Sequence, residues 1–313
     1  MIEEEPLEDE SLLGQPAAEW ARDTSRRALD DLFASAKRYR SGKEFAQLLK
    51  FARRFRFYAP YNAMLLHAQM PGAQFVAPAY RWRRDYGRRI RPGERPLVIL
   101  QTMGPVMFVF DVGQTEAEEG APPLPSLVES PFAATGSGAP ALLSLTTENA
   151  VRDGIRIHLS DEGSQSAGSI RAAEPGKSME FVVARRPEEV RKQVPIRYEL
   201  LLNRRASAAT TYATLLHELG HLYCGHLGTP DAKWWPDRRG LSKQVREFEA
   251  EAIAALVCAR ADIDTPADSY LSGYLETDGE VPEISVELVM KVAGLLEQMG
   301  KERMKLREER KRG

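Results

Sequence analysis

The five residues His217-Glu218-Leu219-Gly220-His221 (HELGH) place two imidazoles four positions apart, with a carboxylate beside the first. Residues 206–219 contain neither Pro nor Gly, and apolar side chains recur there at helical intervals, so one helix is expected at about 206–225. Side chains at positions i and i+4 of a helix lie on one face, so both rings can bind the same zinc ion. Glu218 would stand beside the ion as the general base that takes a proton from water.

A catalytic zinc ion needs a third protein ligand, and three placements compete. His226 is a minor candidate, because its spacing lacks the expected glycine turn and a histidine near a helix end often only caps carbonyls. Glu247 and Glu251 are stronger candidates, because they share one face of a second helix expected at 242–261. One of them would bind zinc and the other would accept the free ring N–H of a ligand histidine. Glu249 points elsewhere and is expected to be a solvated acidic residue.

Other polar and aromatic side chains flank the predicted zinc helix. Tyr223 and His226 are candidates for stabilising the oxyanion of a hydrolysis reaction. Trp234 and Trp235 either line a substrate cleft or cover the core of the domain. These alternatives stay open at the level of sequence.

A basic stretch rich in aromatic residues occupies positions 37–95. It holds fifteen Lys and Arg residues against three acidic residues, a local balance of plus twelve (fifteen minus three). Guanidinium groups neutralise phosphates and aromatic rings stack on unpaired bases, so the stretch predicts binding of single-stranded DNA. Phe51, Phe55 and Tyr58 have helical spacing and are expected in the core. A turn at Pro92-Gly93 is expected to present the arginines on an exposed loop. The predicted DNA-binding residues are Arg81, Trp82, Arg83, Arg84, Arg88, Arg89 and Arg91. A solvated cationic face without a partner is the alternative.

Two family resemblances follow from these segments. HELGH, followed by EFEAEAIA at 247–254, resembles gluzincin-type metallopeptidases and the ImmA/IrrE-type metallo-endopeptidases. The gluzincin resemblance implies Glu247 as the ligand and Glu251 as the hydrogen-bond partner of a ligand histidine, with the opposite assignment still open. Residues 57–111 resemble the single-stranded-DNA-binding domain of ArdC-type antirestriction proteins, which join such a domain to a zincin-like one in this order.

Composition sets the outer limits. With 313 residues, 43% of them apolar, 28% charged and a net charge of −2, the chain can bury two modest cores. Cys224 and Cys258 offer no disulfide framework, which suits a reducing compartment, and both are expected to be packed apolar residues. The N-terminal segment is unlike a signal peptide, and no apolar run reaches membrane-spanning length. A cytoplasmic protein without a membrane partner is expected.

The predicted architecture is α+β with two domains: a small basic α+β module and a mainly helical zincin-like domain. The boundaries are an acidic disordered tail at 1–16, the DNA-binding domain at 17–112, an acidic, proline-rich linker at 113–140 and the metallopeptidase domain at 141–313. An alternative hypothesis to a plain linker is that its acidic side chains pack against the basic face when nucleic acid is absent. Helices are expected near 17–40, 42–56, 60–69, 206–225, 242–261 and 284–310, and strands near 96–101, 106–112, 155–159 and 179–183.

Together these expectations describe a zinc metallo-endopeptidase fused to a single-stranded-DNA-binding module. Its protein substrate would be of the kind of a repressor or a DNA-bound protein, and DNA occupancy could license cleavage. The alternative is a non-proteolytic antirestriction protein that coats single strands and holds a structural zinc ion.

Overall fold

The chain divides into two units, each of which contains helices and strands. The computed structural model describes residues 42–101, 106–124, 138–160, 168–184, 189–263 and 282–307. Unit 1 comprises Met1–Tyr39 and Met64–Glu129, and unit 2 comprises Arg40–Ala63 and Ser130–Gly313. The mixture of helices and strands confirms the predicted α+β class. The helix predicted at 17–40 and the acidic tail at 1–16 lie outside the described residues.

Unit 1 is built around an antiparallel sheet of order β1-β4-β3, and β2 pairs separately with β5. Its strands are β1 (Val76–Ala77), β2 (Arg88–Ile90), β3 (Leu97–Ile99), β4 (Met107–Asp111) and β5 (Thr115–Ala117). β3 and β4 confirm the strands predicted at 96–101 and 106–112. Helix α4 (Ala79–Tyr86) packs on β4 through Trp82, whose ring N–H donates to the Phe110 carbonyl at 2.8 Å.

The segment predicted as a linker, 113–140, is folded at both of its described ends. The Asp111 side chain accepts from Gly113 N, and the Gln114 side chain accepts from Asp111 N, which together cap the short helix η3 (Val112–Gln114). β5 then extends the chain against β2, and α6 (Ala139–Arg152) begins before position 140. The linker prediction is therefore wrong at both ends, and its middle, 125–137, lies outside the described residues.

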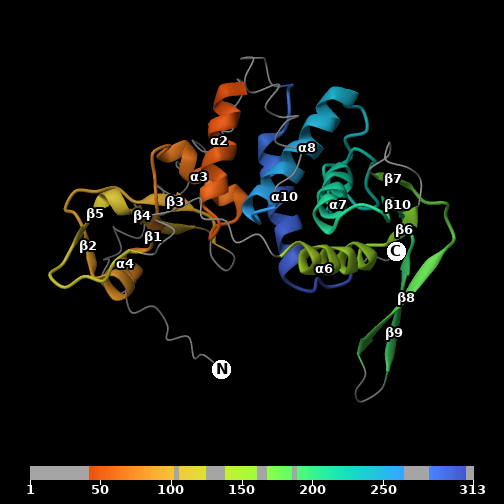
Figure 1. Cartoon of the computed structure of the whole chain (residues 1–313), viewed down its shortest axis with the longest axis horizontal. Helices are drawn as coiled ribbons and strands as arrows, with labels where there is room; N and C mark the ends of the chain where they lie inside the picture. Colours follow the sequence, from red (N-terminus) through yellow and green to blue (C-terminus); the bar gives the residue numbers. More distant parts are fainter. Residues whose placement is uncertain are drawn as a thin grey trace. The chain divides into compact units, whose positions relative to one another are not determined.

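Unit 2 contains a three-stranded sheet of order β6-β10-β7, formed by β6 (Ile155–Ser160), β10 (Tyr198–Asn203) and β7 (Gly168–Ala172). The central strand β10 runs parallel to β6 and antiparallel to β7, and it alternates buried with half-buried residues, as a sheet with one face on a core requires. β8 (Ser178–Ala184) and β9 (Val190–Pro195) form a separate antiparallel ribbon that extends away from the helices of the unit (Figure 1). β6 and β8 confirm the strands predicted at 155–159 and 179–183.

Helices α6 and α7 (Ala208–Tyr223) pack beside this sheet, and the other described helices of unit 2 pack on these two or on one another (Figure 1). These others include α2 (Gly42–Arg54), α8 (Lys243–Arg260) and α10 (Val286–Lys301). Serine caps explain three of the starts: the Ser207, Ser242 and Ser285 hydroxyls each accept the N–H three residues on. α7 and α8 confirm the helices predicted at 206–225 and 242–261. Among the described helices, none combines the length and the hydropathy that a membrane span requires.

Helix α10 is shorter than the 284–310 predicted. Asn149 of α6 donates to the carbonyls of Met299 and Glu302, and its side-chain oxygen accepts from Met304 N. These bonds satisfy the backbone at the end of α10 and let it stop at Lys301. Gly300 and Lys301 are weak local stop signals, whereas the side chain that takes up the free backbone groups is 150 positions away from Met299 in sequence.

Helix α2 belongs to unit 2, so the predicted domain at 17–112 does not form one unit. The Phe45 ring lies 5.7 Å from that of Phe248 in α8. Arg260, also in α8, donates to the carbonyls of Ala52, Phe55 and Tyr58 where the chain leaves α2. In the same region Phe51 and Phe55 are buried and stacked at 4.3 Å, which confirms that these two rings are core.

Candidate metal centre

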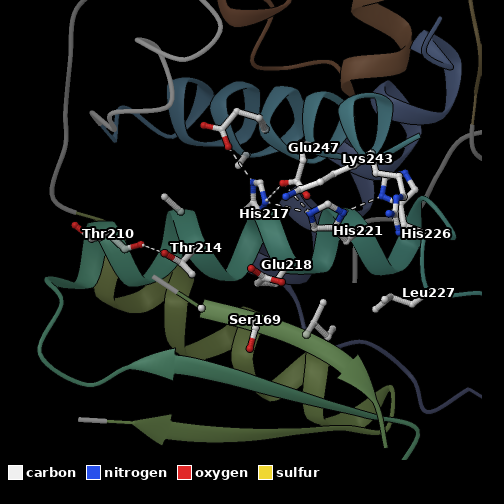
Figure 2. A pocket seen from close by; sticks show the side chains of 16 residues that line it. Ser169, Thr210, Thr214, His217, Glu218, His221, His226, Leu227, Lys243 and Glu247 are labelled. Carbon is white, nitrogen blue, oxygen red and sulfur yellow. Dashed lines mark hydrogen bonds and ion pairs between the residues drawn. The ribbon is translucent and has the colours of Figure 1, made fainter. Parts of the chain in front are cut away.

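Helix α7 places His217 and His221 one turn apart on the same face. Their Nε2 atoms lie 3.2 Å apart, and the rings are nearly perpendicular, with an interplanar angle of 78°. Both rings face a cavity of about 680 Å³ between α7, α8 and β7 (Figure 2). The helix therefore presents two imidazole nitrogens to one point, as the i,i+4 spacing predicts.

Glu247 on α8 completes a group of three donor atoms. Its Oε2 lies 3.5 Å from His217 Nε2 and 3.6 Å from His221 Nε2. Two donors held at about 2.0–2.2 Å by a tetrahedral zinc ion lie about 3.3–3.6 Å apart. The two separations that involve Glu247 lie in that range, and the 3.2 Å between the imidazole nitrogens lies just below it. Two histidines with one glutamate are a known donor set of catalytic zinc. The residues present therefore fit zinc, with Glu247 at the position of the third ligand.

Gly220 explains how α8 comes close enough to α7 to supply this carboxylate. A Cβ atom at Gly220 would lie 3.2 Å from the Cα of Ala250, closer than side-chain atoms normally approach a backbone. The glycine in HELGH thus removes the side chain that would hold the helices apart. Because Ala250 lies between Glu247 and Glu251 in sequence, this close approach sets the distance of both carboxylates from the two imidazoles.

Glu251 contacts the other nitrogen of His217 rather than the donor group. Its Oε2 lies 2.9 Å from His217 Nδ1, so the carboxylate accepts the Nδ1 proton and leaves Nε2 free to face the cavity. Burial lowers the pKa of His217, but the hydrogen bond and the charge of Glu251 outweigh it, so the pKa lies above its usual value. This geometry fits Glu247 as the metal ligand, and Glu251 as the acceptor that orients His217, better than the opposite assignment.

Glu218 lies on the same cavity but outside the donor group (Figure 2). Its side chain is turned toward β7, and only 9% of the residue is exposed. Burial raises the pKa of its carboxyl above the usual range, while nearby His217 and the backbone N–H of Ile170 act in the opposite direction. A carboxylate with a raised pKa beside a donor triad has the properties of a general base.

Two predictions about neighbouring residues are corrected. Glu249, expected to be solvated, has a side chain that is fully buried. Its carboxylate accepts from both terminal nitrogens of Arg238 at 2.7 Å and lies 2.9 Å from His226 Nε2. His226 lies behind His221, with their Nδ1 atoms 2.9 Å apart, so it is not placed as the third ligand. The helix period gave the right direction for Glu249, but that side of α8 is interior.

The candidates for oxyanion stabilisation also change. Tyr223 is buried and its hydroxyl donates to Asp153 at 2.9 Å, away from the cavity. Lys243 and Arg246 of α8 line the cavity, although sequence reasoning missed both. Lys243 stands one turn before Glu247, so the i,i+4 spacing could have placed it on the same face.

Trp234 and Trp235 cover the core rather than the cavity, and neither lines it. Trp235 is buried, and its ring N–H donates to the Gly228 carbonyl at 2.9 Å. Trp234 is half-buried beneath the Arg197 guanidinium, 4.9 Å from the ring centre. Cys224 and Cys258 are both buried free cysteines, as expected of packed residues.

The predicted DNA-binding arginines lie on regular elements of unit 1 rather than on an exposed loop. Arg81, Arg83 and Arg84 are on α4, Arg88 and Arg89 are on β2, and Arg91 follows. Several are paired with nearby groups: Arg81 and Arg84 with Asp85, Arg88 with Thr115, Arg89 with Glu116, and Arg91 with Glu94. The local charge is therefore partly neutralised within the unit.

The prediction that Trp82 contacts DNA is wrong. The residue is 0% exposed, and its ring packs against Phe75 at 5.5 Å and Tyr86 at 5.2 Å, so no face is available to a base. Tyr80, on the same helix, is 56% exposed and has the Arg84 guanidinium 5.7 Å from its ring centre. Among the described aromatic residues of α4, Tyr80 is thus the most exposed and the best placed to stack on a base.

Comparisons with known proteins give a limited result. No protein-family model matches the chain, and no curated protein matches it significantly. Two solved structures match, both crystal structures of the antirestriction protein ArdC from the R388 plasmid. The metal-free form is 16% identical, with a TM-score of 0.31 and coverage of 77% of this chain and 82% of that one. The Mn(II)-bound form is 17% identical, with a TM-score of 0.33 and coverage of 78% and 84%. The similarity is low enough that no residue role is carried over from either structure.

Proposed function

We propose that this chain is a zinc-dependent metallo-endopeptidase whose unit 2 is a zincin-like domain of the ImmA/IrrE type. The observation that carries the proposal is the convergence of His217 Nε2, His221 Nε2 and Glu247 Oε2 at separations of 3.2–3.6 Å. Glu218 lines the cavity onto which these atoms open. Three protein donors leave a fourth tetrahedral position for water or substrate, which is typical of a catalytic rather than a structural zinc site.

The roles of the residues follow from their positions. A bound zinc ion would supply Lewis acidity and make water a competent nucleophile near neutral pH. Glu218 takes the proton of the attacking water and delivers it to the leaving amine. Lys243 and Arg246 are the cationic groups lining the cavity that can balance negative charge developing on the substrate oxygen.

An extended peptide is the substrate that this cavity favours. Ser169 and Ile170 of β7 line it, and β7 ends the described sheet of order β6-β10-β7. The Ile170 N–H of this strand is taken by Glu218. The rest of the β7 edge that faces away from β10 pairs with no other described strand and offers backbone groups to which an extended chain can add. We therefore propose a protein substrate that presents an unfolded segment, such as a repressor or a DNA-bound protein.

The substitution Glu218→Gln tests this function. It keeps the size of the side chain and leaves His217, His221 and Glu247 intact, so zinc content measured by mass spectrometry should stay at one ion per chain. Hydrolysis of a quenched-fluorescent peptide library by the zinc-loaded protein should fall by about 10²- to 10⁴-fold, because the other two carboxylates that line the cavity, Glu247 and Glu251, are engaged with the ligand histidines.

Glu174→Gln is the matched control, because it removes an exposed carboxylate of unit 2 that does not line the cavity. It should retain wild-type hydrolysis. Full activity of the Glu218→Gln protein, or no cleavage of any library peptide by the zinc-loaded wild type, would contradict the proposal.

A second candidate function is non-proteolytic protection of DNA, with a structural zinc ion. It is favoured by the cluster of arginines on α4 and β2 next to the exposed Tyr80, which suits sequence-tolerant binding to single strands. The Glu218→Gln protein separates the two functions. DNA protection that persists without hydrolysis, and that charge reversal of Arg83, Arg84, Arg88 and Arg89 abolishes, assigns the protection to the basic unit. In the coupled case, single-stranded DNA raises the rate of hydrolysis by the wild type.

A further inference from the structure

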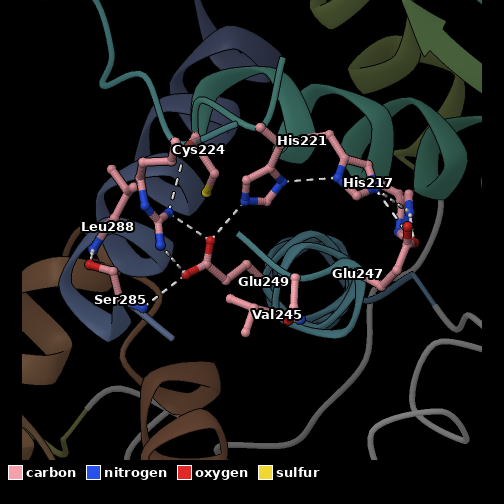
Figure 3. Close-up of polar contacts among 11 residues, drawn as sticks. His217, His221, Cys224, Val245, Glu247, Glu249, Ser285 and Leu288 are labelled. Carbon is pink, nitrogen blue, oxygen red and sulfur yellow. Dashed lines mark hydrogen bonds and ion pairs between the residues drawn. The ribbon is translucent and has the colours of Figure 1, made fainter. Parts of the chain in front are cut away.

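A chain of buried polar groups leads from His221 through His226, which borders the cavity, into the interior (Figure 3). His221 Nδ1 lies 2.9 Å from His226 Nδ1, His226 Nε2 lies 2.9 Å from Glu249 Oε2, and Arg238 donates to both oxygens of Glu249. We propose that His226, Glu249 and Arg238 are positioning residues that fix the tautomer and the orientation of His221 for metal binding. This inference rests on the metal centre of the proposed function.

The tautomers follow from which atoms can donate. Glu249 accepts only, so the 2.9 Å contact requires a proton on His226 Nε2. A neutral His226 then has a bare Nδ1, which can only accept, so the proton shared with His221 resides on His221 Nδ1. His221 Nε2 is left with its lone pair facing the cavity. Reversing the order would place two acceptors against each other at His226 and Glu249.

Arg238 holds the Glu249 carboxylate in place and stabilises its negative charge, so that it can accept the hydrogen bond from His226. Its two terminal nitrogens hold both carboxylate oxygens at 2.7 Å, so the negative charge is balanced by a fixed guanidinium. Ser285 N donates to the same carboxylate at 2.8 Å and ties it to the start of α10. The side chains of His226 and Glu249 are 1% and 0% exposed, so water does not compete for these bonds.

The backbone turns back after α7, and this turn places His226 next to His221. Gly225 follows the C-cap of α7, Cys224, at φ +78°, and a Cβ there would lie 1.9 Å from the Pro236 carbonyl oxygen, so only glycine fits. His226 N donates to the His221 carbonyl at 3.0 Å, and Arg238 N donates to the Gly225 carbonyl at 2.8 Å. One turn thus brings both His226 and Arg238 to the buried side of the zinc helix.

A second metal site at the same place does not fit. Cys224, His226 and Glu249 offer donor atoms close enough for an ion. Both ring nitrogens of His226 and both oxygens of Glu249, however, are already hydrogen-bonded. The Arg238 guanidinium occupies the cation position, so the cluster serves His221 rather than an ion of its own.

Two measurements test the inference. The chain has five histidines, so selective ¹⁵N-histidine labelling of the metal-free protein should resolve their tautomers by NMR. His221 should carry its proton on Nδ1 and His226 on Nε2. A proton on His226 Nδ1 would overturn the proposal, and this measurement needs neither zinc nor a variant.

The second measurement is zinc affinity, by competition with a chromophoric chelator. His226→Leu should raise the Kd by about 10- to 100-fold, the usual effect of losing such a partner. His226→Gln, whose amide oxygen can accept the Nδ1 proton, should recover part of the loss. His158→Leu, on β6 and outside the cavity, is the matched control and should keep the wild-type Kd.

The outcomes separate the two proposals. Zinc binding by the wild type with the same Kd in His226→Leu would contradict the positioning role alone. Failure of the wild-type protein to bind zinc would contradict the metal centre itself. Two zinc ions per chain, with one lost in His226→Leu, would replace the positioning role by a second site.

Discussion

At the scale of single residues, the helix period predicts the direction in which a side chain points but not which groups surround it. Alternate acidic positions in α8 place Glu247 and Glu251 on one face and Glu249 on another, and the structure keeps this division. What each face meets depends on other elements. Glu249 is buried because Arg238 and the start of α10 reach it from outside α8, and nothing in the sequence of α8 announces those partners.

The pKa of His221 is shifted in the direction opposite to that of His217, and its shift predicts how the free energy of unfolding depends on pH. Burial, aided by nearby His217, His226 and Arg246, lowers the pKa of His221 to about 3, against about 6.5 in an unfolded chain. Between these values the unfolded chain binds a proton that the folded chain does not. The free energy of unfolding therefore falls as the pH drops below about 6.5, and the contribution of His221 is fully lost below about 3.

His221→Gln removes this dependence. Urea unfolding of the metal-free protein, in the presence of a chelator, should be measured at pH 7.5 and pH 5.5 for wild type and variant. The wild type should lose about 1 kcal/mol more than the variant over this interval, because one extra proton corresponds to about 1.4 kcal/mol per pH unit. Equal losses would mean that His221 binds its proton equally in the folded and unfolded chains.

At the scale of elements, those with local signals were predictable. α7 and α8 have serine caps and helical periodicity, so their positions followed from the sequence. β7 has the sequence GSIRA, which contains no apolar run. The strand lies at the end of the sheet order and most of its residues are exposed, so it needs no such run. Its position beside Glu218 depends on pairing with β10. The side of the cavity formed by β7 was therefore beyond sequence reasoning.

The contact between α7 and α8 gives a prediction at this scale. Gly220→Ala adds a methyl group 3.2 Å from the Cα of Ala250. Alanine is the better helix former by up to about 1 kcal/mol, but overpacking a helix contact costs about 1–3 kcal/mol. Separation of the helices should move Glu247 away from the imidazoles and raise the Kd for zinc by roughly tenfold, equivalent to about 1.4 kcal/mol.

Gly294→Ala is the matched control for this substitution. Gly294 also lies inside a helix, α10, but a Cβ there would meet only the Pro60 side chain at an ordinary 3.5 Å. It should leave the Kd for zinc unchanged and raise the melting temperature slightly. Wild-type zinc affinity in Gly220→Ala would show that the helices adjust without disturbing the donor group.

At the scale of the whole molecule, linear segmentation misassigned the boundaries. Cutting the chain at composition changes assumes that each unit is continuous, yet unit 2 takes Arg40–Ala63 from the N-terminal part. The contacts that hold α2 there include Arg260, more than 200 positions away along the chain. The clustering of basic residues was visible in the sequence. That Asp85, Glu94 and Glu116 neutralise part of their charge could be seen only in the folded structure.

The ion pair of Arg89 with Glu116 offers the last prediction, which concerns the proposed DNA-binding surface of unit 1. The two side chains meet at 2.7 Å across β2 and β5 and are 62% and 41% exposed. An exposed pair of this kind contributes about 0.2–1 kcal/mol, so a phosphate can compete with Glu116 for Arg89. Glu116→Gln should therefore raise the affinity for a single-stranded oligonucleotide about two- to fivefold, and Arg89→Gln should lower it.

A double-substitution cycle makes this prediction specific. If Glu116 acts by occupying Arg89, the gain from Glu116→Gln should disappear in the Arg89→Gln background. Loss of the Arg89 contact should also reduce the slope of log affinity against log salt by about 0.7, the value for one phosphate on a single strand. Glu180→Gln, which breaks an exposed pair with Arg191 in unit 2, has the same charge change and should leave affinity unaltered if the binding surface lies on unit 1. An equal gain from both glutamate substitutions would instead assign the effect to net charge, and the arginines of α4 and β2 would lose their special role.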